Sequence, residues 1–278
     1  MPARLNPLIL PRLVFWAVLC ALLSYTAADP DLWGHTRFGM DIVDARSLPT
    51  ADPYSFTSDR PWVNHEWLSE VLMGLAYRAA GAPGLAVLKL ALLAAAFWLI
   101  VREVARRGVP PMAQDLLLAM AIVGCFAIVR TLRPQTFSLL LFSGLLIAIR
   151  RAEDGDRRAL WLIPACMPLW PNLHGGWLVG LGIYGVWTAI RCLRPVGPAR
   201  LAWAAAGLAT LLATLVNPEG AGMWRFLWDT VGLGRPDIAE WQPLTRRPLA
   251  DSLPWMLSVV VATITLVRTR GWRAANTS

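Results

Sequence analysis

The chain has 278 residues, of which 56% are hydrophobic and only 16% are charged, and its net charge is +8. A soluble domain usually carries about a quarter charged residues, so this composition excludes a disordered chain, a fibre and an ordinary soluble enzyme. The 25 Arg residues and the single Lys form short runs between apolar segments, which is typical of membrane topology and not of a nucleic-acid-binding face. The four cysteines form no CxxC pair.

Eight apolar segments between the basic runs predict an all-α fold, a polytopic membrane helix bundle of about eight spans. Several segments are shorter than the ~20 residues of a spanning helix, but arginine side chains at their ends can snorkel to the interface. Pro164 and Pro168 interrupt the fifth segment, which is expected to be broken or re-entrant. The segments are residues 13–28, 85–101, 113–129, 136–149, 159–170, 177–190, 201–216 and 253–267.

The arginines also predict the orientation of the bundle. With the N-terminus in the cytoplasm, 15 Arg residues lie on the inner side and 10 on the outer side, where the loops are longer. The chain is then a single transmembrane domain, residues 1–278, with a long first outer loop at 29–84 and a long last one at 217–252. We expect an integral protein of the bacterial inner membrane.

Two segments leave an alternative topology open. Residues 66–80 form either an interfacial amphipathic helix on the outer side, which we favour, or a short span that would reverse the orientation of everything after it. The first apolar segment is either an anchored helix, again the favoured interpretation, or a cleavable signal peptide.

The first outer loop opens with two carboxylates directly after a span. Asp29 and Asp31 can hold a divalent cation or an incoming hydroxyl group. The structural alternative is an Asp-Pro turn, followed by Asp31 as the N-cap of a helix over 32–45. That stretch is amphipathic and suits a position along the membrane surface.

All three histidines fall on the predicted outer side together with most of the acids; they are His35, His65 and His174. A polar cluster on one side of a hydrophobic protein indicates a site there, although long outer loops alone would give the same distribution. Further along the first loop, turn residues alternate with aromatic residues, among them Trp62 and Trp67. The pair His65-Glu66 at a helix start is either a ligand pair or a capped terminus, and we favour capping.

Two short outer turns complete the polar set. The first places Arg130 and Arg133 between two spans and is followed by Gln135. Guanidinium groups there bind phosphate, pair with the loop acids, or only snorkel to the interface. The second turn contains Asn172 and His174, just before a glycine-rich helix start.

Taken together, the runs DPDLWGH, LPTADPYSFT, PWVNHEWLSE, RPQTFS, NLHGG and NPEG resemble bacterial glycosyltransferase-like membrane proteins of the GT-C superfamily. That superfamily includes the oligosaccharyltransferase and protein O-mannosyltransferase group. Its architecture is a first span, a long outer loop with two interfacial helices, expected here near 32–45 and 66–80, and then further spans. In the oligosaccharyltransferase catalytic subunit an Asp is followed by an aromatic residue two positions on and an Arg six positions on. Asp31, Trp33 and Arg37 match that spacing.

The resemblance implies transfer of a sugar from a polyprenyl-phosphate donor in the lipid bilayer to an acceptor on the outer face. It implies Asp31 as the general base or acceptor-orienting carboxylate, with Asp29 or His35 assisting it or binding a cation, so a divalent metal ion is an open possibility. Arg130 or Arg133 would hold the donor phosphate. The substrate path would be formed by Trp62, His65, Glu66, Trp67, Gln135, Asn172 and His174. The alternatives are a non-catalytic membrane protein or partner subunit that retains the fold and, less favoured, a small transporter.

Overall fold

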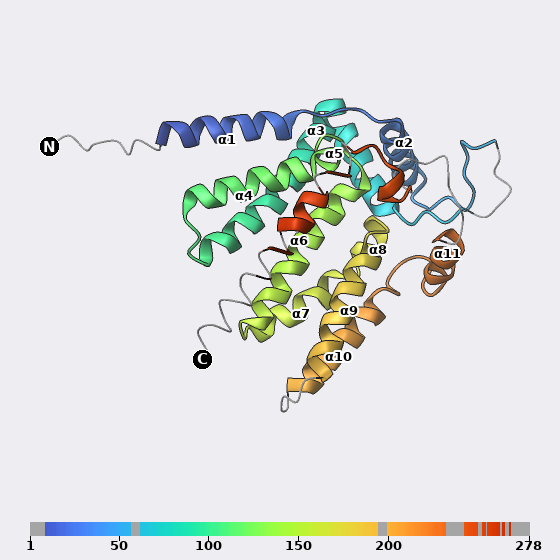
Figure 1. Cartoon of the computed structure of the whole chain (residues 1–278). Coiled ribbons are helices and arrows are strands. Elements are labelled where there is room, and N and C mark those ends of the chain that lie inside the picture. Colours follow the sequence, from blue (N-terminus) through green and yellow to red (C-terminus); the bar gives the residue numbers. More distant parts are fainter. Residues whose placement is uncertain are drawn as a thin grey trace, which may run out of the picture.

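A computed structural model describes residues 9–56, 62–193, 199–231, 242–249 and parts of 252–267. Within these residues the chain is helical and contains no strand, which confirms the predicted all-α class (Figure 1). The last predicted span, 253–267, lies partly outside the described residues. The helices are α1 (Ile9–Ser24), α2 (Pro30–Ala45), α3 (Trp67–Arg106), α4 (Pro111–Gly124), α5 (Phe126–Val129), α6 (Pro134–Glu153), α7 (Arg157–Cys166), α8 (Trp170–Leu173), α9 (Trp177–Leu193), α10 (Ala199–Ala213) and α11 (Gly222–Val231), followed by the 3₁₀ turn η2 (Leu244–Arg246).

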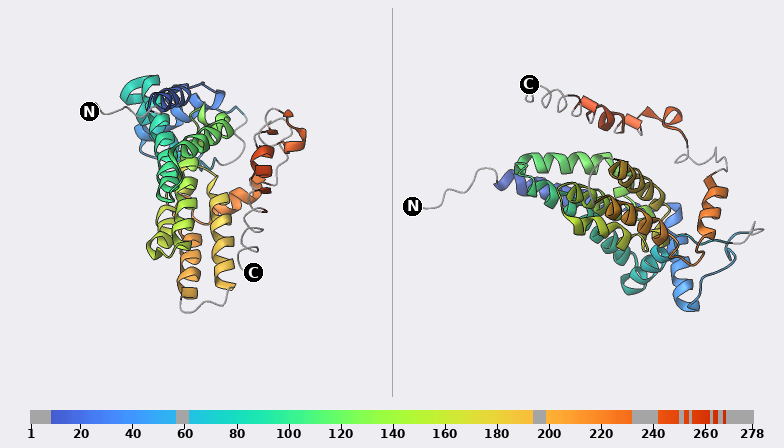
Figure 2. Two further views of the ribbon diagram at one scale, coloured as in Figure 1. Left: turned by 60° about the vertical axis from the view of Figure 1, so that its left-hand side comes forward. Right: turned by 90° about the horizontal axis from the view of Figure 1, so that it is seen from below.

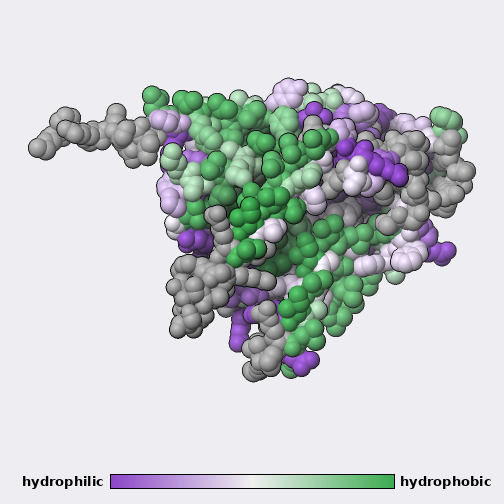
Figure 3. Space-filling model, viewed as in Figure 1, coloured by the Kyte–Doolittle hydropathy of each residue, from purple (hydrophilic) through white to green (hydrophobic). Residues whose placement is uncertain are grey.

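Among the helices that the structure describes, two, α3 and α6, are long and apolar enough to cross a membrane. Helices α1, α4, α9 and α10 are also apolar but shorter. Many large apolar side chains on these helices face outward, and Figure 3 shows them as broad hydrophobic areas on the viewed face. Extended apolar surface of this kind is unusual on a soluble monomer and supports a membrane protein. The number of eight spans stays a prediction.

Helix α3 contains a break between its two halves. Ala80 and Gly81 leave helical geometry, with a positive φ of 62° at Gly81, and Pro83 follows. Glycine tolerates this left-handed region, and a proline cannot continue the hydrogen bonding of the preceding turn. The predicted boundary between a helix over 66–80 and a span over 85–101 therefore coincides with a real kink. The interfacial position of the first half stays a prediction.

The fifth apolar segment is broken, as its prolines predict. Helix α7 ends at Cys166, a turn follows over 167–169, and the short helix α8 begins at Trp170. The break leaves backbone groups available near Pro168, whose carbonyl oxygen accepts a hydrogen bond from Asn172 at 2.8 Å.

Three apolar clusters hold the described helices together. The largest joins α6, α7, α8, α9, α10 and α11, in which the antiparallel α9 and α10 lie side by side (Figure 2). A second joins α1, α3, α4 and α5, and a third joins α2, α3 and Leu132 of the turn before α6. The third cluster matters for function, because it fixes the start of α2 against the start of α6.

The helices give the bundle two chemically different ends. The histidine end comprises residues 29–35, 64–70, 130–138 and 172–176, where α2, α3 and α6 begin and α8 ends. At the opposite end of α3 and α6, Glu103 accepts hydrogen bonds from Arg107 at 2.8 Å and Arg151 at 3.1 Å. Arg107 also pairs with Asp154 at 2.6 Å. We call this the arginine end. It brings together Arg107 and Arg151, which come from two basic runs that the sequence predicts on the inner side of the membrane.

Candidate functional site

The site begins where Asp29 and Asp31 meet Arg133 at the start of α2. Asp29 caps the helix, and its Oδ1 accepts from the backbone N–H groups of Asp31 at 2.9 Å and Leu32 at 3.2 Å. The prediction that Asp31 is the N-cap was wrong, because Pro30 occupies the first helical position and the cap is Asp29, two residues earlier. Arg133 donates from Nε to Oδ2 of Asp29 at 2.7 Å and pairs through Nη2 with Oδ2 of Asp31 at 3.0 Å.

A fully buried lysine brings these two segments together. Lys89 in α3 donates from Nζ to the carbonyl oxygen of Tyr25 at 2.5 Å and to that of Val129 at 3.1 Å. The backbone N–H of Ala27 donates to the carbonyl oxygen of Arg130 at 2.7 Å. These hydrogen bonds join the segment before Asp29 to the turn that carries Arg133. They also supply the buried ammonium group of Lys89 with the hydrogen-bond partners that a buried charge requires.

In the structure the guanidinium group of Arg133 lies between the carboxylates of Asp29 and Asp31, the pair that the sequence suggested could hold a divalent cation. The side chain of Asp29 is 12% exposed and is fully engaged by the helix cap and Arg133. The side chain of Asp31 is 59% exposed, so it can reach a molecule outside the bundle. Among the described residues, no group of three or more His, Cys, Asp or Glu side chains is arranged to hold a metal ion.

Helix α2 packs against the first half of α3 at the closest backbone approach of the histidine end. A Cβ added at Gly39 would lie 1.8 Å from the carbonyl oxygen of Glu70, and one at Gly74 would lie 2.7 Å from the backbone of Gly39. Only glycine allows the two helices to come this near. The contact fixes His35 of α2 beside the carboxylate of Glu70.

Glu70 is a buried carboxylate with two firm partners. Its Oε1 lies 3.0 Å from Nδ1 of His35, and its Oε2 accepts from Nδ2 of Asn64 at 2.5 Å. Burial opposes a charge on His35, but the hydrogen bond to Glu70 and the neighbouring carboxylates outweigh burial and raise the pKa of His35. The pair therefore favours an imidazolium–carboxylate arrangement.

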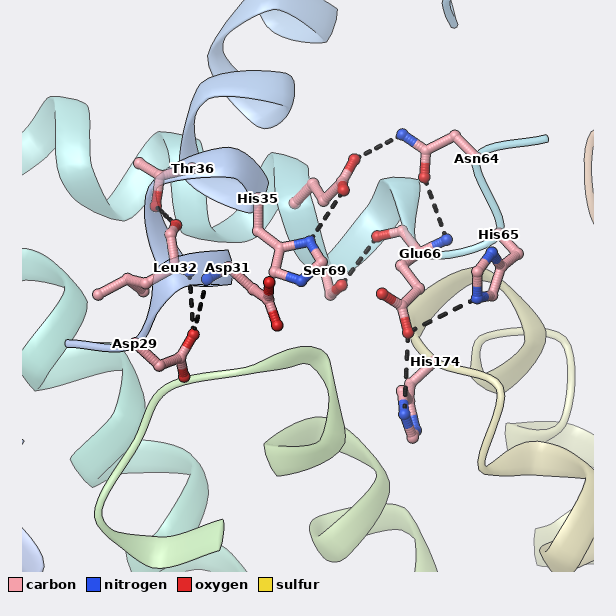
Figure 4. Close-up of polar contacts among 11 residues, drawn as sticks. Asp29, Asp31, Leu32, His35, Thr36, Asn64, His65, Glu66, Ser69 and His174 are labelled. Carbon is pink, nitrogen blue, oxygen red and sulfur yellow. Dashed lines mark hydrogen bonds and ion pairs between the residues drawn. The ribbon is translucent and has the colours of Figure 1, made fainter. Parts of the chain in front are cut away.

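Glu66, one helical turn before Glu70, has a very different environment. Its Oε1 lies 3.7 Å from Nε2 of His65 and 3.7 Å from Nε2 of His174, and its carboxyl group makes no hydrogen bond within the described part of the chain (Figure 4). The side chain is 17% exposed. Burial raises its pKa to about 7. Nearby charges make smaller contributions of both signs: His35 and Arg133 lower the pKa, whereas Glu70 and Asp31 raise it.

His174 faces Glu66 in one defined tautomer. Its Nδ1 accepts from the backbone N–H of Gly176 at 3.0 Å and lies 2.8 Å from Oγ of Ser138. Oγ of Ser138 accepts from Nε1 of Trp170 at 2.7 Å, so the serine donates its own proton to His174. This network assigns the ring proton to Nε2, on the side of Glu66. Burial, assisted by the nearby histidines, lowers the pKa of His174 to about 4, which keeps the ring neutral.

Asn172 and Trp67 join α8 to the start of α3. Nε1 of Trp67 donates to Oδ1 of Asn172 at 2.8 Å, and Nδ2 of Asn172 donates to the carbonyl oxygens of Pro168 and Val216, each at 2.8 Å. All the polar atoms of this buried amide are used. Asn172 therefore connects α8 to the start of α3 and so holds His174 beside Glu66.

The remaining predicted site residues lie around this cluster. Trp62 stacks on Phe38 with ring centroids 5.6 Å apart, and its Nε1 is buried without a hydrogen-bond partner in the described residues. The same holds for Oε1 of Gln135. Arg130 is exposed, whereas Arg37 turns away to Tyr54 and Asp41.

Sequence reasoning missed three contributors, Glu70, Ser138 and Lys89. A signal for Glu70 was present, because Glu66 and Glu70 are four residues apart and therefore share one face of a helix. Lys89 is the only lysine in the chain and sits in an apolar run. Ser138 carries no such signal, since serine is common in apolar helices.

No family model, curated protein sequence or solved structure matches the chain.

Proposed function

We propose that this protein is a polytopic membrane glycosyltransferase that moves a sugar from a polyprenyl-phosphate donor to an acceptor at the histidine end. The observation that carries the proposal is the half-exposed carboxylate of Asp31, anchored by Arg133 beside a cluster of buried acids and histidines. Titratable groups of this kind, gathered at one end of an apolar bundle, are characteristic of functional sites. The sequence resemblance to the GT-C superfamily supplies the reaction class.

The transfer requires one bond to form and one to break. The acceptor hydroxyl oxygen bonds to the anomeric carbon, the bond from that carbon to the phosphate oxygen breaks, and its electron pair leaves with the lipid phosphate. The hydroxyl proton must pass to a base. Asp31 is the proposed contact for the acceptor hydroxyl, because Arg133 fixes its Oδ2 while the side chain remains accessible. Asp29 supports this arrangement through the shared guanidinium.

The proposed donor carries its phosphate at the membrane surface, and the proposed topology would bring the site to that level. Eight spans with the histidine end on the outer face would place the site at the level of lipid phosphates. The arginine end would then face the cytoplasm, in accordance with the excess of inner arginines.

Thiol labelling tests this orientation. Cys192 lies near the end of α9, at the arginine end, and is half-buried. A membrane-impermeant thiol reagent is expected to leave it unlabelled in intact cells and to label it after permeabilisation. The control is Ala51→Cys in a Cys192→Ala background, because Ala51 is exposed in the loop after α2. Labelling of Cys192 but not of the introduced cysteine in intact cells would reverse the orientation.

Arg130 and Arg133 are expected to differ in what their removal does. Arg133 holds two acids, so Arg133→Ala should lower thermal stability and donor binding together. Arg130 is exposed and is available for the donor phosphate, so Arg130→Ala should weaken donor binding by about 1–3 kcal/mol with unchanged thermal stability. Arg130→Lys should restore only part of the binding, because the planar fork is lost. Unchanged binding of a polyprenyl phosphate to Arg130→Ala would assign that arginine to the interface alone.

The proposed function itself is tested with purified protein and polyprenyl-phosphate-linked radiolabelled hexoses. Transfer to an added hydroxyl acceptor, or release of the lipid phosphate, is the expected result. Absence of both, with lipid phosphate still bound, would favour a non-catalytic protein that retains the fold.

A further inference from the structure

We propose that Glu66 is the base of this site, the carboxylate that takes the proton from the acceptor hydroxyl, while Asp31 orients that hydroxyl. This inference rests on the proposed glycosyl transfer and adds a catalytic residue to it. It follows from a contrast between two glutamates four residues apart, Glu66 at the N-cap of α3 and Glu70 in its first turn.

Glu70 is committed to structure. It is 3% exposed, and both of its oxygens are held, one by His35 and one by Asn64. With one protein partner on each oxygen and almost no exposed surface, the Glu70 carboxylate is out of reach of a substrate hydroxyl. Glu66 is the opposite case, because its side chain is mostly buried yet makes no hydrogen bond in the described part of the chain. Such a group exchanges a proton more readily than a paired one.

His174 prepares Glu66 for this role as a positioning residue. The bonds from Gly176 and Ser138 to Nδ1 leave Nε2 as the donor facing the carboxyl of Glu66. At 3.7 Å the donor is close enough to stabilise the carboxylate without holding it in a hydrogen bond. A neutral imidazole also adds no positive charge that would keep Glu66 permanently ionised.

Charged groups of both signs act on Glu66. The groups that act on it come from every element packed around it: Asp31 and His35 of α2, His65 of the preceding loop, Glu70 of α3, Arg133 of the turn before α6 and His174 after α8. His35 and Arg133 favour its ionised form, whereas Glu70 and Asp31 disfavour it, so burial decides. The resulting pKa of about 7 matches the requirement that a base be half-ionised near the operating pH.

In the transfer, the hydroxyl proton moves to the Glu66 carboxylate as the new carbon–oxygen bond forms, and the lipid phosphate departs with the electron pair of the broken bond. The protonated Glu66 then returns the proton to water. The balance needs no further reactant.

The decisive measurement is the pH dependence of kcat/KM for transfer from polyprenyl-phosphate-linked radiolabelled hexoses. In the wild-type protein the rate should rise about tenfold per pH unit below pH 7 and level off above it. Glu66→Gln should lower the rate and abolish this rise with pH, which is the acidic limb of the pH–rate profile. Asp31→Asn should lower the rate but keep the limb. His174→Phe, which removes the Nε2 donor, should move the limb to higher pH, a change that a purely structural role would not produce.

A second readout does not depend on catalysis. Because burial raises the pKa of Glu66 in the folded state, the protein loses stability as the pH rises from about 4.5 to about 7, where the unfolded chain releases this proton more readily. The full cost is present above pH 7, and it is absent below about pH 4.5, where folded and unfolded chains both hold the proton. Glu66→Gln should therefore have a higher Tm than the wild type at pH 8, with a much smaller difference at pH 5.

The outcomes separate the two proposals. An unchanged pH limb in Glu66→Gln, or no Tm gain at pH 8, would overturn the role of Glu66. If the wild-type protein transfers no hexose at any pH, the proposed function fails and the base assignment with it, while the Tm comparison still decides whether Glu66 holds a proton in the folded state.

Discussion

Asp31→Asn is expected to lower the rate of sugar transfer by about 100- to 10,000-fold. The amide keeps the shape of the side chain but loses the negative charge that attracts and orients the acceptor hydroxyl. Folding should change little, because Asp29 and not Asp31 caps α2, and the Asp31 side chain is 59% exposed. The comparison is made by transfer assays and thermal unfolding of purified protein. Near-normal turnover in Asp31→Asn would remove this residue from the reaction.

Asp29→Asn is the matched control, since it makes the same chemical change two residues away. Asparagine is as good an N-cap as aspartate, so the helix start should survive. The ion pair with Arg133 is lost, however, and of the two carboxylates that pair with this guanidinium only that of Asp31 keeps its charge. We expect a lower Tm and a moderate loss of activity through displacement of Asp31. A larger loss of activity in Asp29→Asn than in Asp31→Asn, at equal Tm, would exchange the roles of the two acids.

The sequence was sufficient to predict elements whose causes are local. The apolar segments between basic runs predicted the all-α class, and the kink in α3 and the break after α7 follow from Gly81 and from prolines inside apolar runs. The Asp29-Pro30 pair marks a helix start, although the assignment of the cap to the wrong aspartate shows how a single proline shifts the boundary.

The partners within the site could not be predicted in this way, because they are distant in the chain. Arg133 meets Asp29 across 104 residues, and Trp67 meets Asn172 across 105. The sequence left Arg133 with three uses, as a phosphate ligand, as a partner of the loop acids or as an interfacial anchor. The packing of α2, α3 and Leu132, together with the hydrogen bonds of Lys89, brings its guanidinium to the two acids. Its function toward a donor phosphate stays a prediction.

Gly39→Ala is expected to disrupt the histidine end more than any other single methyl group would. The new Cβ would lie 1.8 Å from the carbonyl oxygen of Glu70, which is far inside van der Waals contact, and the atom it meets is backbone that cannot rotate away. Helix α2 must therefore separate from α3. We expect the free energy of unfolding to fall by about 1–3 kcal/mol or more, since about 1–3 kcal/mol is the usual range for overpacking, and the Tm to fall with it.

Gly34→Ala in the same helix is the matched control. A Cβ at Gly34 has no heavy atom within 4 Å, and alanine is favoured over glycine in a helix interior by about 1 kcal/mol, so this variant should be unchanged or more stable. The separation of α2 and α3 in Gly39→Ala also draws His35 away from Glu70, so activity should fall even at temperatures where the protein remains folded. Equal Tm values for the two alanine variants would show that α2 and α3 do not approach through Gly39, and the placement of His35 beside Glu70 would lose its structural basis.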